Sequence, residues 1–319
     1  MLHLESEPNA QLSVSTPYTW TGLTQSSEWA GGKFGVIQSP ESYDGGILGT
    51  ATYTNFQHSY YVDANGQKHM ISKEVVTFSN SHTDGSMSQK MSNNINLAQN
   101  PINFIVYGSF SVDCDFKFYD ENGQLINFAN TSAWVSPMSL NANNVPDYYD
   151  DDNNGTLTHA GMLREACEVL EGGTPYQLAG SSITLHNGND FYSDHDNSIT
   201  QNGSKYSIEQ WDGVPDHEYY GAGLIRLTGD HLKLRFHEAF TDDQAATGSL
   251  VRGTQGDKHN GHLQLSAIPD HSLNSAWAQM STVIPQTPTP RTEVHYHYDV
   301  NDKCKEKPNG VTTYQSESK

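Results

Sequence analysis

The segment 207–236 concentrates flat aromatic side chains and carboxylates around a glycine-rich turn. Its residues of interest are Trp211, Asp212, Glu218, Tyr219 and Tyr220. Aromatic faces stack on polar rings, and carboxylates accept hydrogen bonds from hydroxyl groups. This combination predicts a surface groove for a ligand that carries rings and hydroxyls. The structural alternative is that the three aromatic rings belong to the core.

Hydrolysis of a glycan is a second chemistry that the same carboxylates allow. A glycosidase places two carboxyl groups roughly 5–10 Å apart across the bond that it cleaves. The segment offers four acidic residues for that role: Glu209, Asp212, Asp216 and Glu218. The sequence contains neither a serine-nucleophile elbow nor a phosphate-binding loop. Acidic, aromatic grooves bind as readily as they cleave, so we interpret the segment as a binding site rather than an active site.

The acidic loop 147–155 places carboxylate and amide oxygens at alternate positions before a glycine. Such oxygens are the ligands that Ca²⁺ prefers, and the candidates are Asp150, Asp152 and Asn154. The glutamate that closes an EF-hand is absent, because Gly161 occupies its position. A solvated acidic loop is the structural alternative. A second oxygen-rich run at 187–198 could share one ion with the first.

The composition is that of a loop-rich β protein with many polar side chains. Hydrophobic residues make up 35% of the chain, charged residues make up 17%, and Tyr occurs 17 times. The net charge of −20 disfavours charge-driven binding to nucleic acid or anionic lipid, because such binding depends on Lys and Arg clusters. No apolar run is long enough to span a membrane and no leader is recognisable, so we expect no membrane insertion by this chain.

Short strands separated by turns are expected to position these groups. Segments rich in Val, Ile, Phe, Tyr and Thr lie at 50–56, 70–79, 102–118, 133–138, 181–186, 222–228, 231–236 and 263–267. Within 109–118, apolar residues alternate with Asp113, Asp115 and Lys117, which indicates an antiparallel strand with one wet face. Asn-Gly turns at 63–66 and 120–123 favour hairpins. The sequence therefore predicts an all-β sandwich.

One helix is predicted, over residues 158–171, where apolar side chains recur at helical spacing before Gly172 and Gly173. Strand-like sequence is expected to begin near Phe34. We divide the chain into an N-terminal extension at 1–29, a lectin-like domain at 30–284, and a Pro-rich linker and tail at 285–319.

Three cysteines, Cys114, Cys167 and Cys304, cannot all pair within one chain. Their spacing fits no metal site and no redox motif. Two buried thiols and one thiol in the tail are the interpretation that we favour. A disulfide between Cys114 and Cys167 is the alternative.

Several blocks, taken in order, resemble a known family. They are ATYTNFQHSYY (51–61), ISKEVVTF (71–78), FKFYDENGQLINF (116–128), WVSPMSLNANN (134–144), LAGSSITLHNG (178–188) and WDGVPDHEYYGAGLIRLTG (211–229). The series is similar to the variable domain of the antigen I/II family of Gram-positive surface adhesins and to the glucan-binding protein C domain. The tail EVHYHYDV is similar to aggregation-substance relatives.

The resemblance implies a lectin-like antiparallel β-supersandwich with a few short helices, on a wall-anchored protein of the bacterial cell surface. It implies binding without catalysis, to a polymeric carbohydrate, a glycoprotein or a cell-wall glycopolymer such as lipoteichoic acid. Extracellular DNA is a ligand of some relatives, and calcium occurs in some members. The matching positions add Ser139, Asn141 and Ser182 to the expected groove. The segment 145–175 does not follow the sequence pattern of the family, so the resemblance does not identify the ligand.

The resulting hypothesis is an adhesin domain that acts in adhesion, aggregation or biofilm formation. Ring stacking on Trp211, Tyr219 and Tyr220 would supply affinity, while carboxylates and amides would orient the hydroxyls. A docking module for extracellular DNA or protein in cell–cell aggregation is the alternative, with weak, strongly salt-sensitive DNA binding. A glycan-cleaving hydrolase is a third possibility.

Overall fold

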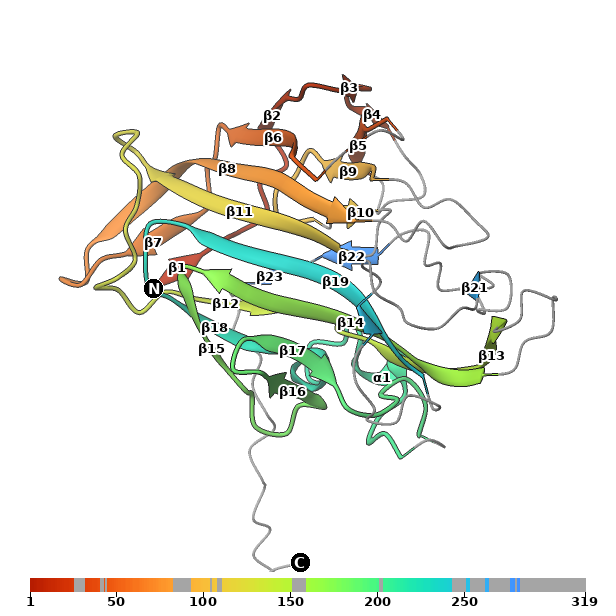
Figure 1. Cartoon of the computed structure of the whole chain (residues 1–319). Coiled ribbons are helices and arrows are strands. Elements are labelled where there is room, and N and C mark those ends of the chain that lie inside the picture. Colours follow the sequence, from red (N-terminus) through yellow and green to blue (C-terminus); the bar gives the residue numbers. More distant parts are fainter. Residues whose placement is uncertain are drawn as a thin grey trace, which may run out of the picture.

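The computed structural model describes residues 1–25, 32–40, 43, 45–82, 93–103, 105–107, 111–150, 159–200 and 203–242, and four short strands at 251–252, 262–263, 276–278 and 280–281. Long twisted strands dominate this part of the chain (Figure 1). Two helical turns occur among the described elements, α1 (Ile208–Trp211) and η2 (Glu218–Gly221). No helix in these ranges is long and apolar enough to cross a membrane.

The largest sheet has 13 strands, and every strand pairing in it is antiparallel. Its main path runs β1 (Leu2–His3), β7 (Tyr60–Val62), β8 (Lys68–His82), β11 (Ser111–Asp120), β19 (Leu232–Asp242), β14 (His159–Glu171), β13 (Ala142–Asp150) and β21 (His262–Leu263). Five further strands pair beside this path: β2 (Gln11–Ser15), β6 (Ile47–Thr54), β16 (Ile183–His186), β17 (Asp190–Ser193) and β20 (Val251–Arg252).

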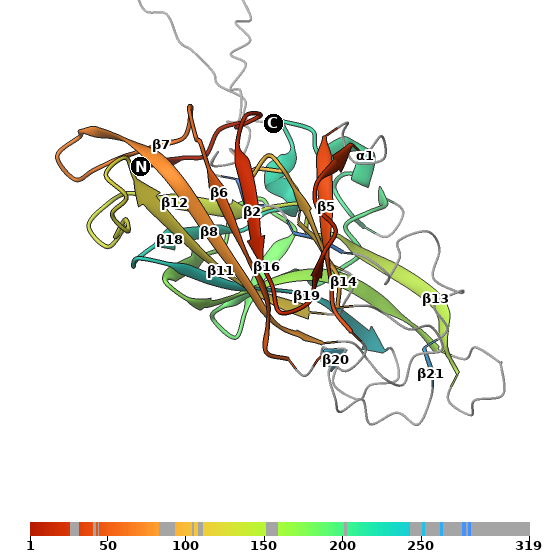
Figure 2. The same cartoon turned by 90° about the horizontal axis from the view of Figure 1, so that it is seen from above.

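Two smaller antiparallel sheets complete the architecture. The six-stranded sheet contains β22 (Ala276–Ala278), β10 (Ile105–Tyr107), β9 (Ile95–Ala98), β5 (Lys33–Gln38), β3 (Thr19–Trp20) and β4 (Thr24–Gln25). The four-stranded sheet contains β15 (Gly173–Tyr176), β18 (Leu224–Leu227), β12 (Trp134–Pro137) and β23 (Met280–Ser281). Seen from above, the strands of the large sheet fan out in a progressive twist (Figure 2).

One continuous hydrophobic core joins the three sheets. Side chains of the large sheet, such as Phe78 and Leu234, share a single buried cluster with Ile95 of the six-stranded sheet and with Val135 and Ile225 of the four-stranded sheet. Each smaller sheet therefore packs on the large one, as expected for a sandwich. The predicted all-β fold class is confirmed.

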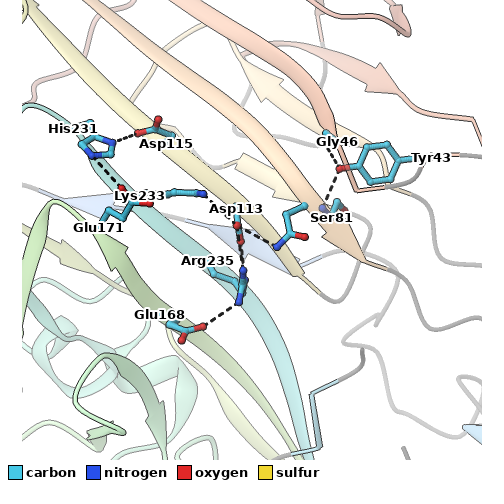
Figure 3. Close-up of polar contacts among 11 residues, drawn as sticks. Tyr43, Gly46, Ser81, Asp113, Asp115, Glu168, Glu171, His231, Lys233 and Arg235 are labelled. Atoms are coloured by element: carbon cyan, nitrogen blue, oxygen red, sulfur yellow. Dashed lines mark hydrogen bonds and ion pairs between the residues drawn. The ribbon is translucent and has the colours of Figure 1, made fainter. Parts of the chain in front are cut away.

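The strand predicted at 109–118 is confirmed as β11, with one apolar face and one polar face on which Asp113 is itself buried. Val112, Cys114, Phe116 and Phe118 are buried, while Phe110 lies outside the described residues. The opposite face carries an ion-pair network that spans three strands (Figure 3). Its centre is Asp113, which accepts two hydrogen bonds from Arg235, at 2.7 and 3.2 Å. Glu168 on β14 pairs with the same guanidinium at 3.4 Å.

The helix predicted over 158–171 is wrong, because these residues form the central strand β14. It pairs with β19 from Gly161↔Asp242 to Glu171↔Lys233 and with β13 on its other side. The strand is covered on both faces over part of its length: Cys167 and Val169 are buried, and so are Arg164 and Ala166. Burial of both faces removes the alternation that marks a half-exposed strand and leaves a pattern that resembles a helix.

Strands begin well before the predicted start near Phe34. β1 pairs with β7, and β2 pairs with β6 along its whole length. The predicted extension 1–29 is therefore hydrogen-bonded into the sheets over its described part. Its polar sequence reflects the position of β2, which pairs with β6 on one side and exposes every second residue. The linker and tail at 285–319 lie outside the described residues.

The two described cysteines are free and buried, as the favoured interpretation expects. Cys114 lies on β11 and Cys167 on β14, and burial raises the pKa of both thiols. The alternative, a disulfide between them, is not formed. Cys304 lies outside the described residues.

Candidate functional site

The three aromatic rings predicted to line a groove form a separate buried cluster. Trp211 is 1% exposed, Tyr219 is 2% exposed and Tyr220 is 5% exposed. Leu178, Tyr206 and Ile208 pack against them. A ring with so little exposed surface cannot stack on a ligand. The surface-groove interpretation of these rings is therefore wrong, and the core alternative describes them.

Close packing and hydrogen bonds hold these rings in place. The indole Nε1–H of Trp211 donates to the backbone oxygen of Asn197 at 2.8 Å. A Cβ on Gly221 would lie 2.0 Å from the Trp211 ring, so only glycine fits there. The hydroxyl of Tyr220 accepts from the backbone N–H of Lys205 at 2.8 Å. The aromatic and glycine residues of the segment 207–236 thus build a rigid support.

The polar residues of the prediction converge beside this support. We define the acidic pole as Ser139, Asn141, Glu165, Asp212 and Glu218. All five are partly exposed, and they come from three separate parts of the chain. Asn141 donates to Glu165 Oε2 from its backbone N–H and from its side-chain Nδ2, each at 3.0 Å. Ser139 hydrogen-bonds to Asp212. In Figure 1, α1 accordingly lies below β14, which carries Glu165.

Burial raises the pKa of all three carboxyl groups at the acidic pole. Burial raises the pKa of Glu165 to about 7, and the nearby charge of Asp212 adds to this. Burial also raises the pKa of Asp212. For Glu218, burial and then the charge of Asp212 act in the same direction. The pole therefore favours hydrogen-bond donors, because they stabilise its crowded negative charge.

Backbone and side-chain details preorganise the acidic pole. Ser139 adopts φ of 61°, in the left-handed region that non-glycine residues rarely occupy. Such a conformation persists only where the surroundings impose it, and it often marks a functional site. Asn141 Oδ1 is buried and has no hydrogen-bond partner among the described residues, although its amide nitrogen is well bonded. An acceptor left in this state requires an explanation, such as an additional donor.

Ser182 is structural and not part of the acidic pole. Its side chain is buried and donates to the backbone oxygen of Tyr220 at 2.7 Å. It also accepts from Asn197 Nδ2 at 2.9 Å. Because both bonds are internal, Ser182 offers nothing to a ligand in this arrangement.

The sequence prediction missed Glu165 and Asn197. Glu165 falls within the helix predicted over 158–171, and as a β14 residue it accepts a hydrogen bond from Asn141. Asn197 is hydrogen-bonded to three other segments, through Leu140 and Ala142, through Ser182, and through Trp211. The only signal for Asn197 was its place in the oxygen-rich run 187–198, which suggested calcium.

The oxygen-rich run uses its side chains for internal hydrogen bonds. Asp190 bonds to His237 at 2.8 Å, and Asp196 accepts from the backbone N–H of Ser198 at 2.9 Å. No cluster of His, Cys, Asp and Glu suited to a metal ion occurs in the part of the chain that the structure describes. Of the predicted calcium ligands, Asp152, Asn154 and the side chain of Asp150 lie outside it.

The architecture is shared with bacterial adhesin domains of known structure. Glucan binding protein C of Streptococcus mutans has a TM-score of 0.58 at 20% identity, over 94% of this chain and 82% of that one. The adhesin domain of PrgB from Enterococcus faecalis gives 0.52 at 16% identity, over 81% and 68%. Its DNA-bound form gives 0.51 at 17% identity, over 79% and 71%. The fold is thus that of an adhesin domain.

The family assignment follows from the sequence match. The family model "Glucan-binding protein C" matches residues 44–279, which is most of the chain. The chain therefore belongs to the glucan-binding protein C family, and the resemblance seen in the sequence blocks is confirmed.

Proposed function

We propose that this chain is a non-catalytic adhesin domain of the bacterial cell surface, within a longer wall-anchored protein. Its ligand would be a polymeric carbohydrate, a glycoprotein or a cell-wall glycopolymer such as lipoteichoic acid. One observation carries the proposal. Four residues predicted from two distant sequence blocks, Ser139, Asn141, Asp212 and Glu218, lie together with Glu165 at one partly exposed pole.

Hydroxyl groups are the complementary chemistry for this pole. Carboxylates accept charge-assisted hydrogen bonds, and a sugar offers several hydroxyl donors at fixed spacing. A carboxyl with a pKa of about 7, such as that of Glu165, can accept or donate near neutral pH. The buried rings would hold the pole rigid instead of stacking on the ligand, which reduces the ordering cost of binding.

Substitution of the two most exposed functional carboxylates should weaken carbohydrate binding. We expect Asp212→Asn and Glu218→Gln each to reduce affinity for an α-glucan polymer roughly tenfold or more, because a hydrogen bond to a charged group contributes about 1.5–3 kcal/mol. Isothermal titration or surface plasmon resonance would measure this.

Glu209→Gln is the matched control, since Glu209 lies on α1, shortly before Asp212, but is exposed to solvent. Unchanged affinity in all three variants would remove the acidic pole from the proposal. Release of reducing ends that disappears in Glu218→Gln would instead indicate a hydrolase.

DNA is the second candidate ligand, because the PrgB adhesin domain was solved bound to DNA. The net charge of −20 opposes it in this chain. Any DNA binding should therefore be weak and fall steeply as salt rises. Calcium at Asp150, Asp152 and Asn154 remains a prediction, and no step of the proposal depends on it.

A further inference from the structure

An exposed aromatic pair lies on the four-stranded sheet, outside the acidic pole. Tyr176 at the end of β15 is 43% exposed, and Trp134 at the start of β12 is partly exposed. Their ring centroids are 5.5 Å apart and the ring planes are inclined by 58°. The two rings therefore present faces in different directions and form an angled surface rather than a flat one.

The strand between them supplies polar groups on the same face. Arg226 on β18 lies opposite Trp134 in the register of β12 and opposite Thr174 in the register of β15. Arg226 and Thr174 are exposed, whereas Val135 and Ile225, one position along, are buried in the core. Because side chains alternate along a strand, Trp134, Tyr176, Thr174 and Arg226 share the outer face of this sheet. We call these four residues the aromatic platform.

Arg226 is free to take part in binding. No ion pair to Arg226 occurs in the part of the chain that the structure describes. This contrasts with Arg235 on the large sheet, which Asp113 and Glu168 hold in place (Figure 3). A guanidinium next to exposed rings can donate several hydrogen bonds to a ligand that stacks beside it.

We propose that the aromatic platform is a second carbohydrate subsite, which binds a neutral sugar ring of the same polymer as the acidic pole. The ring would stack on Trp134 and Tyr176, while Arg226 and Thr174 bond to its hydroxyls. This inference rests on the proposed carbohydrate function.

The charge around the platform favours a neutral polyol over the other occupants. A nucleic acid would need a cluster of cations, yet the platform has one, in a chain of net charge −20 with Glu171 and Asp230 exposed nearby in sequence. A purely apolar partner would leave Arg226 and Thr174 without hydrogen bonds. A sugar can stack on the aromatic rings and also accept hydrogen bonds from Arg226 and Thr174.

The fold connects the platform to the acidic pole through two strands. β12 leads from Trp134 directly to Ser139 and Asn141, and β18 starts directly after the turn that follows Glu218. The five residue steps from Trp134 to Ser139 span at most roughly 17 Å, so the two sites lie within reach of one polymer. Engagement of both sites by one chain would raise the apparent affinity without a new contact at either.

Variants at the platform test this inference. We expect Tyr176→Ala and Arg226→Gln each to lower affinity for dextran about threefold to tenfold, while isomaltotriose should still saturate the acidic pole. In the Asp212→Asn protein, saturation-transfer NMR should still detect isomaltotriose bound at the aromatic platform. Adding Tyr176→Ala to this variant should remove that signal. Leu125→Ala is the control, because Leu125 is 38% exposed and lies in the hairpin that follows β11, outside the four-stranded sheet.

Each outcome separates the two proposals. If Tyr176→Ala and Arg226→Gln leave dextran affinity unchanged while the acidic-pole variants lose it, the platform inference is overturned and the proposed site stands. If only the platform variants lose affinity, the acidic pole is not the site and the platform stands. If neither set has an effect, both fail. Binding of single-stranded DNA that Tyr176→Ala removes would overturn the choice of a sugar.

Discussion

Replacement of Trp211 by alanine should destabilise the protein strongly. We expect the free energy of unfolding to fall by about 3–5 kcal/mol, because the substitution removes a fully buried aromatic side chain and leaves a cavity. The substitution also leaves the buried backbone oxygen of Asn197 without the Trp211 Nε1–H bond. Urea denaturation followed by circular dichroism would measure the loss.

Trp134→Ala provides the comparison, since Trp134 is only partly buried on an outer sheet face. It should cost clearly less stability than Trp211→Ala. Hydrogen exchange should show the increased opening of Trp211→Ala around Asn197 and in 208–221, where its contacts lie. A loss below about 1 kcal/mol would mean that Trp211 is not the core residue that its burial indicates. Trp211→Ala is consequently unsuitable as a selective probe of ligand binding.

Glu74 should make the stability of the protein fall as pH rises from about 4.5 to about 8. It is 4% exposed and faces the core on β8, beside Tyr53 in the register of β6. Burial raises its pKa from 4.5 to about 8. The folded state therefore retains a proton that the unfolded chain releases at lower pH, and stability is lost as pH rises from about 4.5 to about 8.

A Glu74→Gln variant isolates this contribution. The two pKa values differ by about 3.5, and each pKa unit corresponds to about 1.4 kcal/mol. We expect wild type to lose roughly 3–4 kcal/mol more stability between pH 5 and pH 8 than Glu74→Gln does. Glu165, with a pKa of about 7, contributes in the same direction to both proteins and cancels in the comparison. Equal pH dependence of the two proteins would contradict the burial of an uncharged Glu74.

The parts of the fold that were predictable have one apolar and one polar face. In β11 the strict alternation of Cys114, Phe116 and Phe118 with Asp113 and Asp115 identified the strand and its orientation. The turns at 63–66 and 120–123 were predictable because Gly66 and Gly123 adopt positive φ there. In both turns the preceding Asp side chain also accepts backbone N–H bonds.

What could not be predicted depends on contacts between distant segments. β14 contains residues with high helix propensity, but its backbone is hydrogen-bonded to β13 on one side and to β19 on the other. This pairing stabilises the strand by more than the helix propensity of its residues, which is a few tenths of a kcal/mol per residue. The predicted groove failed for a related reason. The carboxylates beside Trp211 and Tyr220 suggested that the rings are exposed to solvent. The rings are buried, whereas Asp212 and Glu218 are partly exposed. Sequence neighbours in a loop do not share a face.

The most direct test of the proposed function is an equilibrium titration of the unaltered protein with an α-glucan polymer and, separately, with a short DNA duplex at two salt concentrations. We predict saturable glucan binding that changes little with salt, is weakened in Asp212→Asn, and has no comparable DNA counterpart. DNA binding that is tight, falls steeply with salt and is indifferent to Asp212→Asn, with no binding of glucan, would contradict the proposed function.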